Sequence, residues 1–295
     1  IDAVTWAESE GLERVILSGM GRSFAAGADT KEFDQPAIAP HLPDVVNRIE
    51  TSTVPWIAAI HGTALGGGGE LALGCRYRIA RADATIGFPE VILGLVPGAG
   101  ATQRLPRLVG LTEALKLIPT GKVISGKAAM AIGLVNAIDD DPVAAAKLID
   151  QKILSEAVPL SLMKAGTDKT VSYDTARQLA IRKMRGQEAP LTAISLLETA
   201  QTATFDDGMQ KERNAFLALR ASPQARALRH IFFAERAAKK PPKAIETQKS
   251  TLKPLNHVIV IGGGTMGSGI AYAFLNANIR VTIMESDDAG MQRAN

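Results

Sequence analysis

The sequence contains few of the residues that crosslink chains, bind metals or stack on bases. Cys75 is the only cysteine in 295 residues, which excludes an intrachain disulfide and a cysteine-rich zinc site and fits a reducing compartment. Aromatic residues make up 4% of the chain, too few for the stacking platforms of single-stranded nucleic-acid binders. The histidines, His41, His61, His230 and His257, are too scattered to predict a metal site.

The sequence also lacks the pattern of a signal peptide or of a membrane span. Residues 1–10 include three acids and no long apolar run. Residues 258–279 carry no charge, but three consecutive glycines interrupt them, and each glycine costs a helix about 1 kcal/mol relative to alanine. We therefore predict a strand, a glycine turn and a helix there. The chain begins without an initiator methionine, so we expect a fragment of a longer protein.

Positive charge is concentrated in one segment. The formal net charge is +3 at pH 7, which alone would suggest an acidic partner such as nucleic acid, anionic lipid or a phosphorylated ligand. Between residues 203 and 254, however, Lys and Arg clearly outnumber Asp and Glu, so the rest of the chain is net negative. The positive charge therefore belongs to this segment and not to the whole chain.

Short apolar runs alternate with helical patterns in the first half of the chain. We predict strands at 15–17, 54–60 and 77–80, and helices at 43–52 and 71–75. This alternation favours an α/β layered domain.

The second half of the chain is mostly helical. After residue 140, helices are predicted at 142–154, 175–185, 191–204, 207–221 and 222–239. Pro241 and Pro242 then open a polar linker, and a strand–turn–helix unit begins at His257.

The most unusual motif is a run of four glycines, 66–69, that leads directly to Glu70 and an apolar helix. Glycine allows backbone to approach a ligand closely, and amides at a helix start can bind an anion or a developing oxyanion. Alternatively, Glu70 complements the helix dipole and the glycines permit tight packing. The pattern alone leaves both readings open.

Two further turns carry acids. Glu90 precedes the glycine-rich turn 94–100 and stands among apolar neighbours, where burial raises a carboxyl pKa and suits a proton donor; a partly exposed loop acid is the alternative. Asp29 and Glu32 have the spacing of a capping box, which would leave amides near Ala28 exposed at a helix start. Together these parts suit acid–base chemistry on a carbonyl compound.

The order and spacing of these motifs resemble the crotonase (enoyl-CoA hydratase/isomerase) superfamily. The matching segments are Ser-Phe-Ala-Ala-Gly-Ala-Asp at 23–29, Gly-Gly-Gly-Gly-Glu-Leu-Ala at 66–72, Pro-Glu at 89–90 and Pro-Gly-Ala-Gly-Ala-Thr-Gln-Arg-Leu at 97–105. The resemblance implies an α/β fold: a crotonase-like spiral of ββα units with a helical extension, followed by an incomplete Rossmann-type βαβ unit. The domains implied are a hydratase/isomerase domain at 1–188, a helical extension and linker at 189–254, and the start of an NAD-binding domain at 255–295.

The same resemblance implies roles for individual residues. Glu70 and Glu90 look like the catalytic acid–base pair, and the amides of Ala28 and Gly67 like the oxyanion hole for a thioester oxygen. The residues that would contact the substrate or its water are Ala26, Asp29, Gly66 and Gly98. No metal is implied.

The second glycine motif lies near the end of the chain. Gly262, Gly264 and Gly267 form a G-x-G-x-x-G between a predicted strand at 258–261 and a helix, and Glu285 follows a second strand at 280–284. This arrangement is typical of a dinucleotide site in which the acid binds the ribose, favouring NAD; a turn without a ligand is the alternative. It resembles the dehydrogenase half of multifunctional β-oxidation enzymes.

The chain as a whole is similar to the amino-terminal part of such an enzyme, an enoyl-CoA hydratase fused to a 3-hydroxyacyl-CoA dehydrogenase and truncated at both ends. The resemblance implies hydration of 2-trans-enoyl-CoA without a cofactor, together with Δ3-Δ2 isomerisation. It implies NAD only for the truncated unit, in which we expect no dehydrogenase activity. The alternatives are a different crotonase chemistry, such as thioester hydrolysis or decarboxylation, and an inactive fragment or scaffold lobe.

The resemblance also bears on partners and location. We expect an acyl-CoA substrate, no nucleic acid, no membrane span, and a thiolase subunit as partner of the longer enzyme. The location implied is the bacterial cytoplasm, or the peroxisome in a eukaryote. Some of the basic residues Arg236, Lys239, Lys240 and Lys243 could face the phosphates of CoA, and a solvated helix face with a linker is the alternative.

Overall fold

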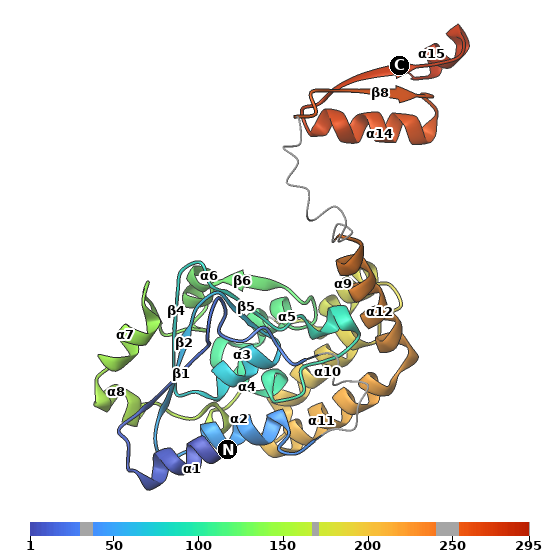
Figure 1. Cartoon of the computed structure of the whole chain (residues 1–295). Coiled ribbons are helices and arrows are strands. Elements are labelled where there is room, and N and C mark those ends of the chain that lie inside the picture. The colour runs from blue at the N-terminus through green and yellow to red at the C-terminus, as the bar shows by residue number, and fades with distance from the viewer. Residues whose placement is uncertain (30–37, 167–170, 240–253, 295) are drawn as a thin grey trace. The chain divides into compact units, whose positions relative to one another are not determined.

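The predicted alternation of strands and helices is present in the computed structural model (Figure 1). The structure describes residues 1–29, 38–166, 171–239 and 254–294. They fall into two compact units, residues 1–237 and 238–295. The larger unit contains the candidate hydratase motifs and the smaller one contains the glycine turn at 262–267.

The main sheet of the larger unit is entirely parallel, with strand order β1-β2-β4-β7. Its strands are β1 (Val15–Ser18), β2 (Trp56–Ile60), β4 (Tyr77–Ala80) and β7 (Ala137–Ile138). Every residue of β2 is buried, which explains its continuous apolar sequence, because a parallel strand is covered on both faces. The strands predicted at 15–17, 54–60 and 77–80 are confirmed.

A smaller sheet, β3-β5-β6, supports the glycine turns. It consists of β3 (Thr63–Leu65), β5 (Thr85–Gly87) and β6 (Val123–Ser125), with β3 parallel and β6 antiparallel to β5. Strands of three residues are too short to give an alternating pattern, so the sequence did not reveal them. Because β3 leads into Gly66 and β5 leads toward Glu90, this sheet brings two predicted site segments together.

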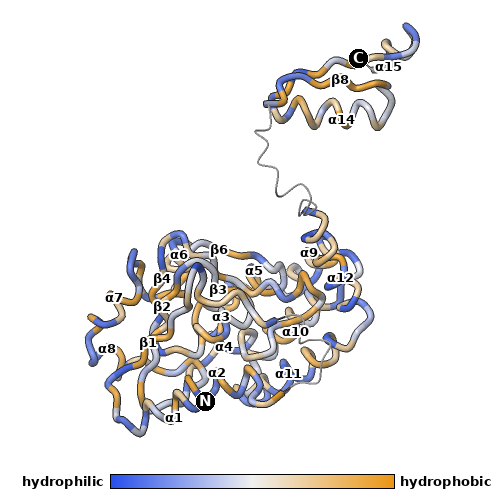
Figure 2. The backbone as a smooth tube through the Cα atoms, in the orientation of Figure 1, coloured by the Kyte–Doolittle hydropathy of each residue, from blue (hydrophilic) through white to orange (hydrophobic). Residues whose placement is uncertain are grey.

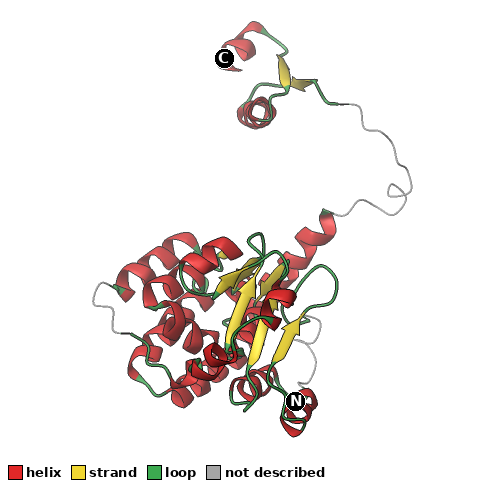
Figure 3. Ribbon diagram, turned by 90° about the vertical axis from the view of Figure 1, so that its left-hand side faces the viewer, coloured by secondary structure: helices red, strands yellow, loops and turns green. Residues whose placement is uncertain are grey.

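Helices surround the two sheets (Figure 3). They are α1 (Asp2–Ser9), α2 (Leu42–Glu50), α3 (Gly67–Gly74), α4 (Ala101–Val109), α5 (Leu111–Leu117), α6 (Gly126–Ala131), α7 (Pro142–Lys147), α8 (Gln151–Glu156), α9 (Tyr173–Lys183), α10 (Ala189–Thr202), α11 (Phe205–Ala221) and α12 (Pro223–Ala238), with 3-10 helices η2 (Pro89–Leu93) and η3 (Leu160–Leu162). Helix α7 packs on β1, β2 and β4, whereas α10 packs on α4, α5 and α11. The main core is built from β2, β4, α3, α4, α5 and α10, and a smaller apolar cluster lies between the main sheet and helices α7 and α8.

One predicted helix is wrong in its extent. The single helix expected at 142–154 is two helices, α7 and α8, separated at residues 148–150. Leu148 is 84% exposed, and the Asp150 carboxylate accepts a hydrogen bond from the Lys152 amide at 2.8 Å, which caps the second helix. The aspartate signal for a new helix start was therefore present in the sequence.

Cys75 packs at the end of α3. It is 3% exposed, and its thiol donates to the Leu71 carbonyl at 3.4 Å. Burial raises the pKa of the Cys75 thiol to about 12, so it is not activated as a nucleophile.

The smaller unit is a single strand–helix–strand–helix segment. It comprises β8 (His257–Ile261), α14 (Thr265–Asn276), β9 (Arg280–Met284) and α15 (Asp288–Ala294), and its two strands are parallel. Figure 2 shows the strongly hydrophobic sequence of β8. The strand, turn, helix and second strand predicted for this region are confirmed.

Candidate active site

The two amides predicted to form an oxyanion hole, those of Ala28 and Gly67, lie near each other. Ala25 forms an isolated parallel bridge with Ala64 of β3, which brings the segment at 25–28 to the start of α3. A Cβ atom built on Gly67 would lie 3.7 Å from the Ala28 nitrogen. Within the described part of the chain neither amide has a hydrogen-bond acceptor. Both are therefore available to bind an anionic oxygen.

Gly66 lies between this pair of amides and the two acids predicted to be catalytic, Glu70 and Glu90. Its φ of +52° and ψ of −123° belong to a region that glycine adopts without strain and other residues rarely adopt. A Cβ atom on Gly66 would lie 2.8 Å from Oε1 of Glu90, so the absence of a side chain leaves room for that carboxylate. Ala26 and Asp29, also predicted to contact substrate, are exposed on the neighbouring segment. Glu32 and the proposed capping box lie outside the described residues.

Glu70 is buried in the first turn of α3, 2% exposed. Its Oε1 atom accepts hydrogen bonds from the amides of Ala99 at 2.8 Å and Ala101 at 3.1 Å. Burial raises the pKa of Glu70, and these amides, together with the positive charge of Arg104, oppose the rise. The carboxylate is thus held in one orientation by groups that favour its ionised form.

Glu90 lies in the first turn of η2 and has a different environment. Its Oε2 atom is buried and has no hydrogen-bond partner among the described residues. Burial raises the pKa of Glu90 well above its ordinary value, and the charges of Glu70 and Glu212 raise it further. Two nearby carboxyl groups are thereby pushed toward different protonation states, with Glu90 the more readily protonated, which is the usual arrangement of an acid and a base.

A third buried acid of the site, Glu212 of α11, was not predicted from the sequence; it has no exposed surface. Its Oε1 accepts from the Gly100 amide at 2.6 Å, and its Oε2 accepts from the Thr102 amide at 2.8 Å and the Thr102 hydroxyl at 2.6 Å. Burial, followed by repulsion from Glu70, raises the pKa of Glu212 to about 8. The available signal was its spacing: Glu212 lies four residues after Gly208 and seven before Leu219, on the buried stripe of its helix.

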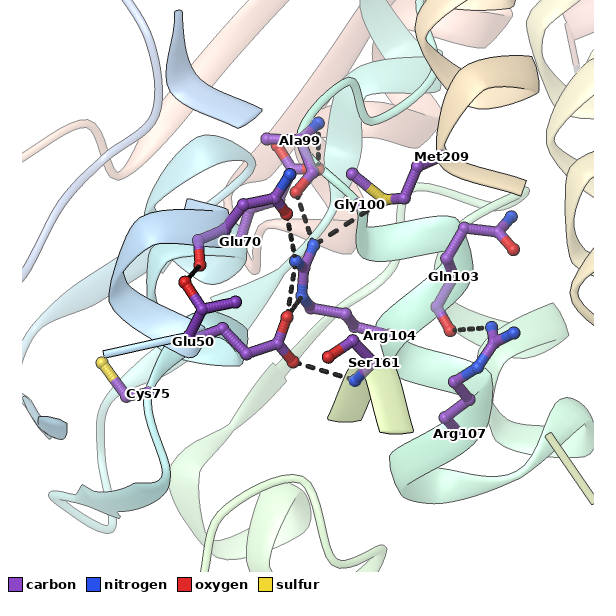
Figure 4. Close-up of polar contacts among 12 residues, drawn as sticks. Glu50, Glu70, Cys75, Ala99, Gly100, Gln103, Arg104, Arg107, Ser161 and Met209 are labelled. Carbon is purple, nitrogen blue, oxygen red and sulfur yellow. Dashed lines mark hydrogen bonds and ion pairs between the residues drawn. The ribbon is translucent and has the colours of Figure 1, made fainter. Parts of the chain in front are cut away.

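A buried ion pair supports the same turn (Figure 4). Arg104, with no exposed surface, donates to Oε2 of Glu50 from Nε at 3.0 Å and from Nη2 at 2.7 Å. Arg104 also donates to Oδ1 of Asn47 at 2.6 Å and to the Ala99 carbonyl at 3.0 Å. The backbone of Ala99 is therefore fixed on both sides, by Arg104 at its carbonyl and by Glu70 at its amide.

Gly98 lies at the start of the turn, against helix α11. A Cβ atom on Gly98 would lie 2.7 Å from Cγ of Phe216, so no larger residue fits without displacing the ring. The Gly98 amide also lowers the pKa of Glu70, which indicates that it faces this carboxylate. An open hollow of about 440 Å³ at the ends of β1, β2 and β4 includes His61 and Arg81 and none of the predicted site residues.

The glycine turn of the smaller unit has the local geometry that a dinucleotide requires. Gly262 follows β8 with φ +92°, and a Cβ atom on Gly267 would lie 1.7 Å from the Gly262 carbonyl oxygen, so α14 approaches the strand only with glycine there. Gly264 caps α14, and a Cβ atom on it would meet nothing within 4 Å. The Glu285 carboxylate accepts a hydrogen bond from the Gly263 amide. These residues fit the pyrophosphate and ribose of NAD.

The basic residues proposed to face CoA phosphates are only partly described. Arg236 is exposed, with its guanidinium 5.3 Å from the centroid of the Phe232 ring, and Lys239 is exposed. Lys240 and Lys243 lie outside the described residues. Across the described ranges, no group of three or more His, Cys, Asp or Glu side chains could hold a metal ion. No helix in those ranges is long and apolar enough to cross a membrane.

Known proteins match both units in sequence. The relatives include the peroxisomal bifunctional enzyme of Cavia porcellus, 39% identical over 294 residues that make up 96% of this chain and 40% of that protein. The fatty acid oxidation complex subunit alpha of Shewanella baltica is 35% identical over 300 residues, covering 95% of this chain and 42% of that protein. The chain thus spans well under half the length of these relatives.

Fold and family profiles agree with these relatives. OdaA of Pseudomonas aeruginosa is a similar solved structure, with a TM-score of 0.52 at 25% identity, covering 78% of this chain and 85% of that chain. Residues 257–295 match the family described as 3-hydroxyacyl-CoA dehydrogenase, NAD binding domain. Residues 1–213 match the family described as Enoyl-CoA hydratase/isomerase. The chain belongs to the enoyl-CoA hydratase/isomerase family.

Proposed function

We propose that this chain is an enoyl-CoA hydratase of fatty-acid β-oxidation, which adds water to 2-trans-enoyl-CoA in the syn sense and forms 3-hydroxyacyl-CoA. The observation that carries the proposal is the contrast between two neighbouring acids. Glu70 has a carboxylate held by backbone amides, whereas Glu90 has a buried oxygen without a partner. Hydration requires such a pair, because one group takes a proton from water while the other supplies one to carbon.

In the proposed reaction, Ala28 and Gly67 bind the thioester oxygen through their amides. Ionised Glu70 takes a proton from water, and the water oxygen forms a bond to Cβ. The electron pair of the double bond moves toward the thioester, and the two amides stabilise the resulting enolate oxygen. Protonated Glu90 then gives its proton to Cα. The Gly98 amide helps to hold the water.

The acids must return to their starting states after each turnover. Glu70 ends protonated and Glu90 ionised, so one proton has to pass from the first to the second, directly or through the next water. The different surroundings of the two acids favour this return, because burial and neighbouring acids raise the pKa of Glu90 well above its ordinary value, whereas backbone amides and Arg104 favour the ionised form of Glu70. With Glu90 alone as proton shuttle between two carbon atoms of the acyl chain, the same site would carry out the Δ3-Δ2 isomerisation.

The smaller unit and the partners of the longer enzyme extend the proposal. Gly262, Gly264, Gly267 and Glu285 would hold NAD, which supplies hydride-accepting chemistry in a dehydrogenase. The hydratase itself uses no cofactor. A thiolase subunit would be a partner of the longer protein, located in the bacterial cytoplasm or in a peroxisome. Phosphate contacts by Arg236 or Lys239 remain part of the same proposal.

The decisive experiment measures loss of the conjugated thioester absorbance when purified protein is mixed with a 2-trans-enoyl-CoA. We expect turnover by the wild type and a product heavier by one water. Glu70→Gln and Glu90→Gln should each lower kcat by about 10²- to 10⁴-fold. Glu113→Gln is the matched control, because this glutamate pairs with Lys116 at the surface of α5 and should leave the rate unchanged.

Three outcomes would contradict the proposal. An inactive wild type would favour an inactive fragment or scaffold lobe. Full activity in both Glu→Gln variants would exclude the two acids from the chemistry. Release of free CoA thiol without addition of water to the acyl chain would indicate thioester hydrolysis. A separate NAD titration tests the smaller unit and does not affect the hydratase assignment.

A further inference from the structure

Four successive backbone amides, those of residues 99–102, are divided between two buried acids. Ala99 and Ala101 donate to Glu70, while Gly100 and Thr102 donate to Glu212. These amides lie at and just before the start of α4, where a helix has no internal acceptors for its amides. The turn therefore has one conformation that satisfies both carboxylates.

The peptide between Ala99 and Gly100 is clamped at both ends. Arg104 donates to its carbonyl oxygen at 3.0 Å, and its amide donates to Glu212 at 2.6 Å. Gly100 has a φ of +107°, and a Cβ atom there would lie 1.8 Å from Nη1 of Arg104 and 2.9 Å from Sδ of Met209. Rotation of this peptide would break both contacts and so disturb the turn whose neighbouring amides, those of Ala99 and Ala101, donate to Glu70.

Neighbouring hydrogen bonds favour an ionised Glu212. The Gln103 side-chain amide donates to the Leu196 carbonyl at 3.2 Å and to the Thr102 hydroxyl oxygen at 3.0 Å. The hydroxyl hydrogen of Thr102 is then directed at Glu212, 2.6 Å away. Glu212 thus accepts three hydrogens, and protonation of its carboxyl group would replace an acceptor with a donor.

Several charged groups surround Glu212. The charge of Glu70 of α3 disfavours ionisation of Glu212, and the charge of Glu212 in turn disfavours ionisation of Glu90 of η2. The positively charged Arg104 of α4 contacts Met209, which lies one turn away on α11. Lys211 and Arg213 are its neighbours along α11.

We propose that Glu212 is a positioning residue of the hydratase site, whose ionised carboxylate fixes the turn at 99–102 and, through that turn, orients Glu70 toward the substrate water. The inference rests on the proposed hydratase function. It predicts that kcat rises with pH as Glu212 ionises, because only the ionised form accepts all three donors. The amides proposed to bind the thioester, those of Ala28 and Gly67, are not among the donors to Glu212, so KM should not follow this ionisation.

The first test compares pH profiles of the wild type, Glu212→Gln and Thr102→Val. Wild-type kcat should rise through an inflection near the pKa of Glu212, about 8. Glu212→Gln should lose that inflection and, above it, roughly 10- to 100-fold in kcat with little change in KM. Thr102→Val removes one donor and should move the inflection to higher pH. Glu235→Gln, at an exposed site on α12, is the matched control and should keep the wild-type profile.

The second test uses no substrate. In ¹⁵N-labelled protein the Gly100 and Thr102 amide shifts should titrate together in the wild type and stay flat over the same range in Glu212→Gln. An inactive wild type would overturn the proposed hydratase function. In an active enzyme, flat amide shifts in the wild type would overturn this inference alone. The inference would also be overturned if Glu212→Gln lowered stability and kcat by the same amounts at every pH and kept the inflection of kcat near pH 8.

Discussion

Replacing Arg104 with methionine should strongly destabilise the larger unit. The Arg104 and Glu50 side chains are 0% and 3% exposed, so neither charge is solvated. Methionine has a similar length and is apolar, and it would leave Glu50 with only the Ser161 amide, at 2.9 Å, among its present donors. The acceptors on Asn47 and Ala99 would also lose their partner.

The expected loss of stability follows from the charge of Glu50, which would stay buried without its partner. Removing one member of a buried ion pair typically costs about 3–5 kcal/mol, because the other charge stays buried without compensation. Each kcal/mol lowers Tm by about 2–4 °C in a unit of this size, so we expect a fall of roughly 6–20 °C. Loss of the positive charge also removes an influence that lowers the pKa of Glu70, so the acidic limb of the activity profile should move to higher pH.

Tryptophan fluorescence during urea unfolding provides the assay. The only two tryptophans of the chain, Trp6 and Trp56, both belong to the larger unit, and Trp56 is 6% exposed in its core. The signal therefore follows the unit that contains Arg104 and is insensitive to the smaller one. Arg81→Met is the matched control, because Arg81 pairs with Asp83 in a solvent-exposed ion pair, and we expect a far smaller change.

A double variant tests whether the unpaired charge of Glu50 causes the loss of stability in Arg104→Met. Glu50→Leu combined with Arg104→Met removes both charges and should recover most of the lost stability, because an apolar replacement of a buried pair is often neutral. The reasoning would be refuted if Arg104→Met were as stable as Arg81→Met. It would also be refuted if the double variant lost more unfolding free energy than the two single variants lose together.

Three further predictions concern other parts of the larger unit. Gly66→Ala should lower kcat and stability together, because its backbone region disfavours alanine by about 1–3 kcal/mol and its Cβ would lie 2.8 Å from the Glu90 carboxylate; an unchanged kcat would contradict this. The Cys75 thiol, buried and with a pKa raised to about 12, should not react with a disulfide reagent in native protein and should react fully in urea. Arg48 lowers the pKa of Glu8 from 4.5 to about 2, so their pair stabilises the protein above pH 4.5 and loses this effect as the pH falls toward 2. The Tm difference between wild type and Glu8→Gln should therefore be greatest near neutral pH and vanish at about pH 2.

The sequence revealed those parts of the fold that rest on local patterns. The apolar run at 54–60 and the glycine turn at 262–267 each specify their structure within a few residues, and both are confirmed. The strands β3, β5 and β6 were missed because three residues show no period. The break between α7 and α8 was missed because apolar residues continue through it, although Leu148 is exposed.

The same distinction between local motifs and contacts distant in sequence applies to the candidate site. Glu70, Glu90, Ala28 and Gly67 were predicted from motifs close in sequence, and their roles remain predictions although the fold brings them near one another. Glu212 was missed because it lies 110 residues from Thr102, and no local motif marks it. Only its place on the buried stripe of α11 signals that its charge must be compensated inside the protein.

The alternating allocation of the amides at 99–102 has a consequence for the evolution of this turn. Inserting or deleting one residue there would shift the alternation by one position. Amides that now donate to Glu70 would then face Glu212, and those that donate to Glu212 would face Glu70, so a change in length would disturb both acids at once. Substitutions that preserve the chain length leave the allocation of amides unchanged, provided that they keep the glycine at 100, the space around it and the hydroxyl at 102. This turn should consequently vary in composition well before it varies in length.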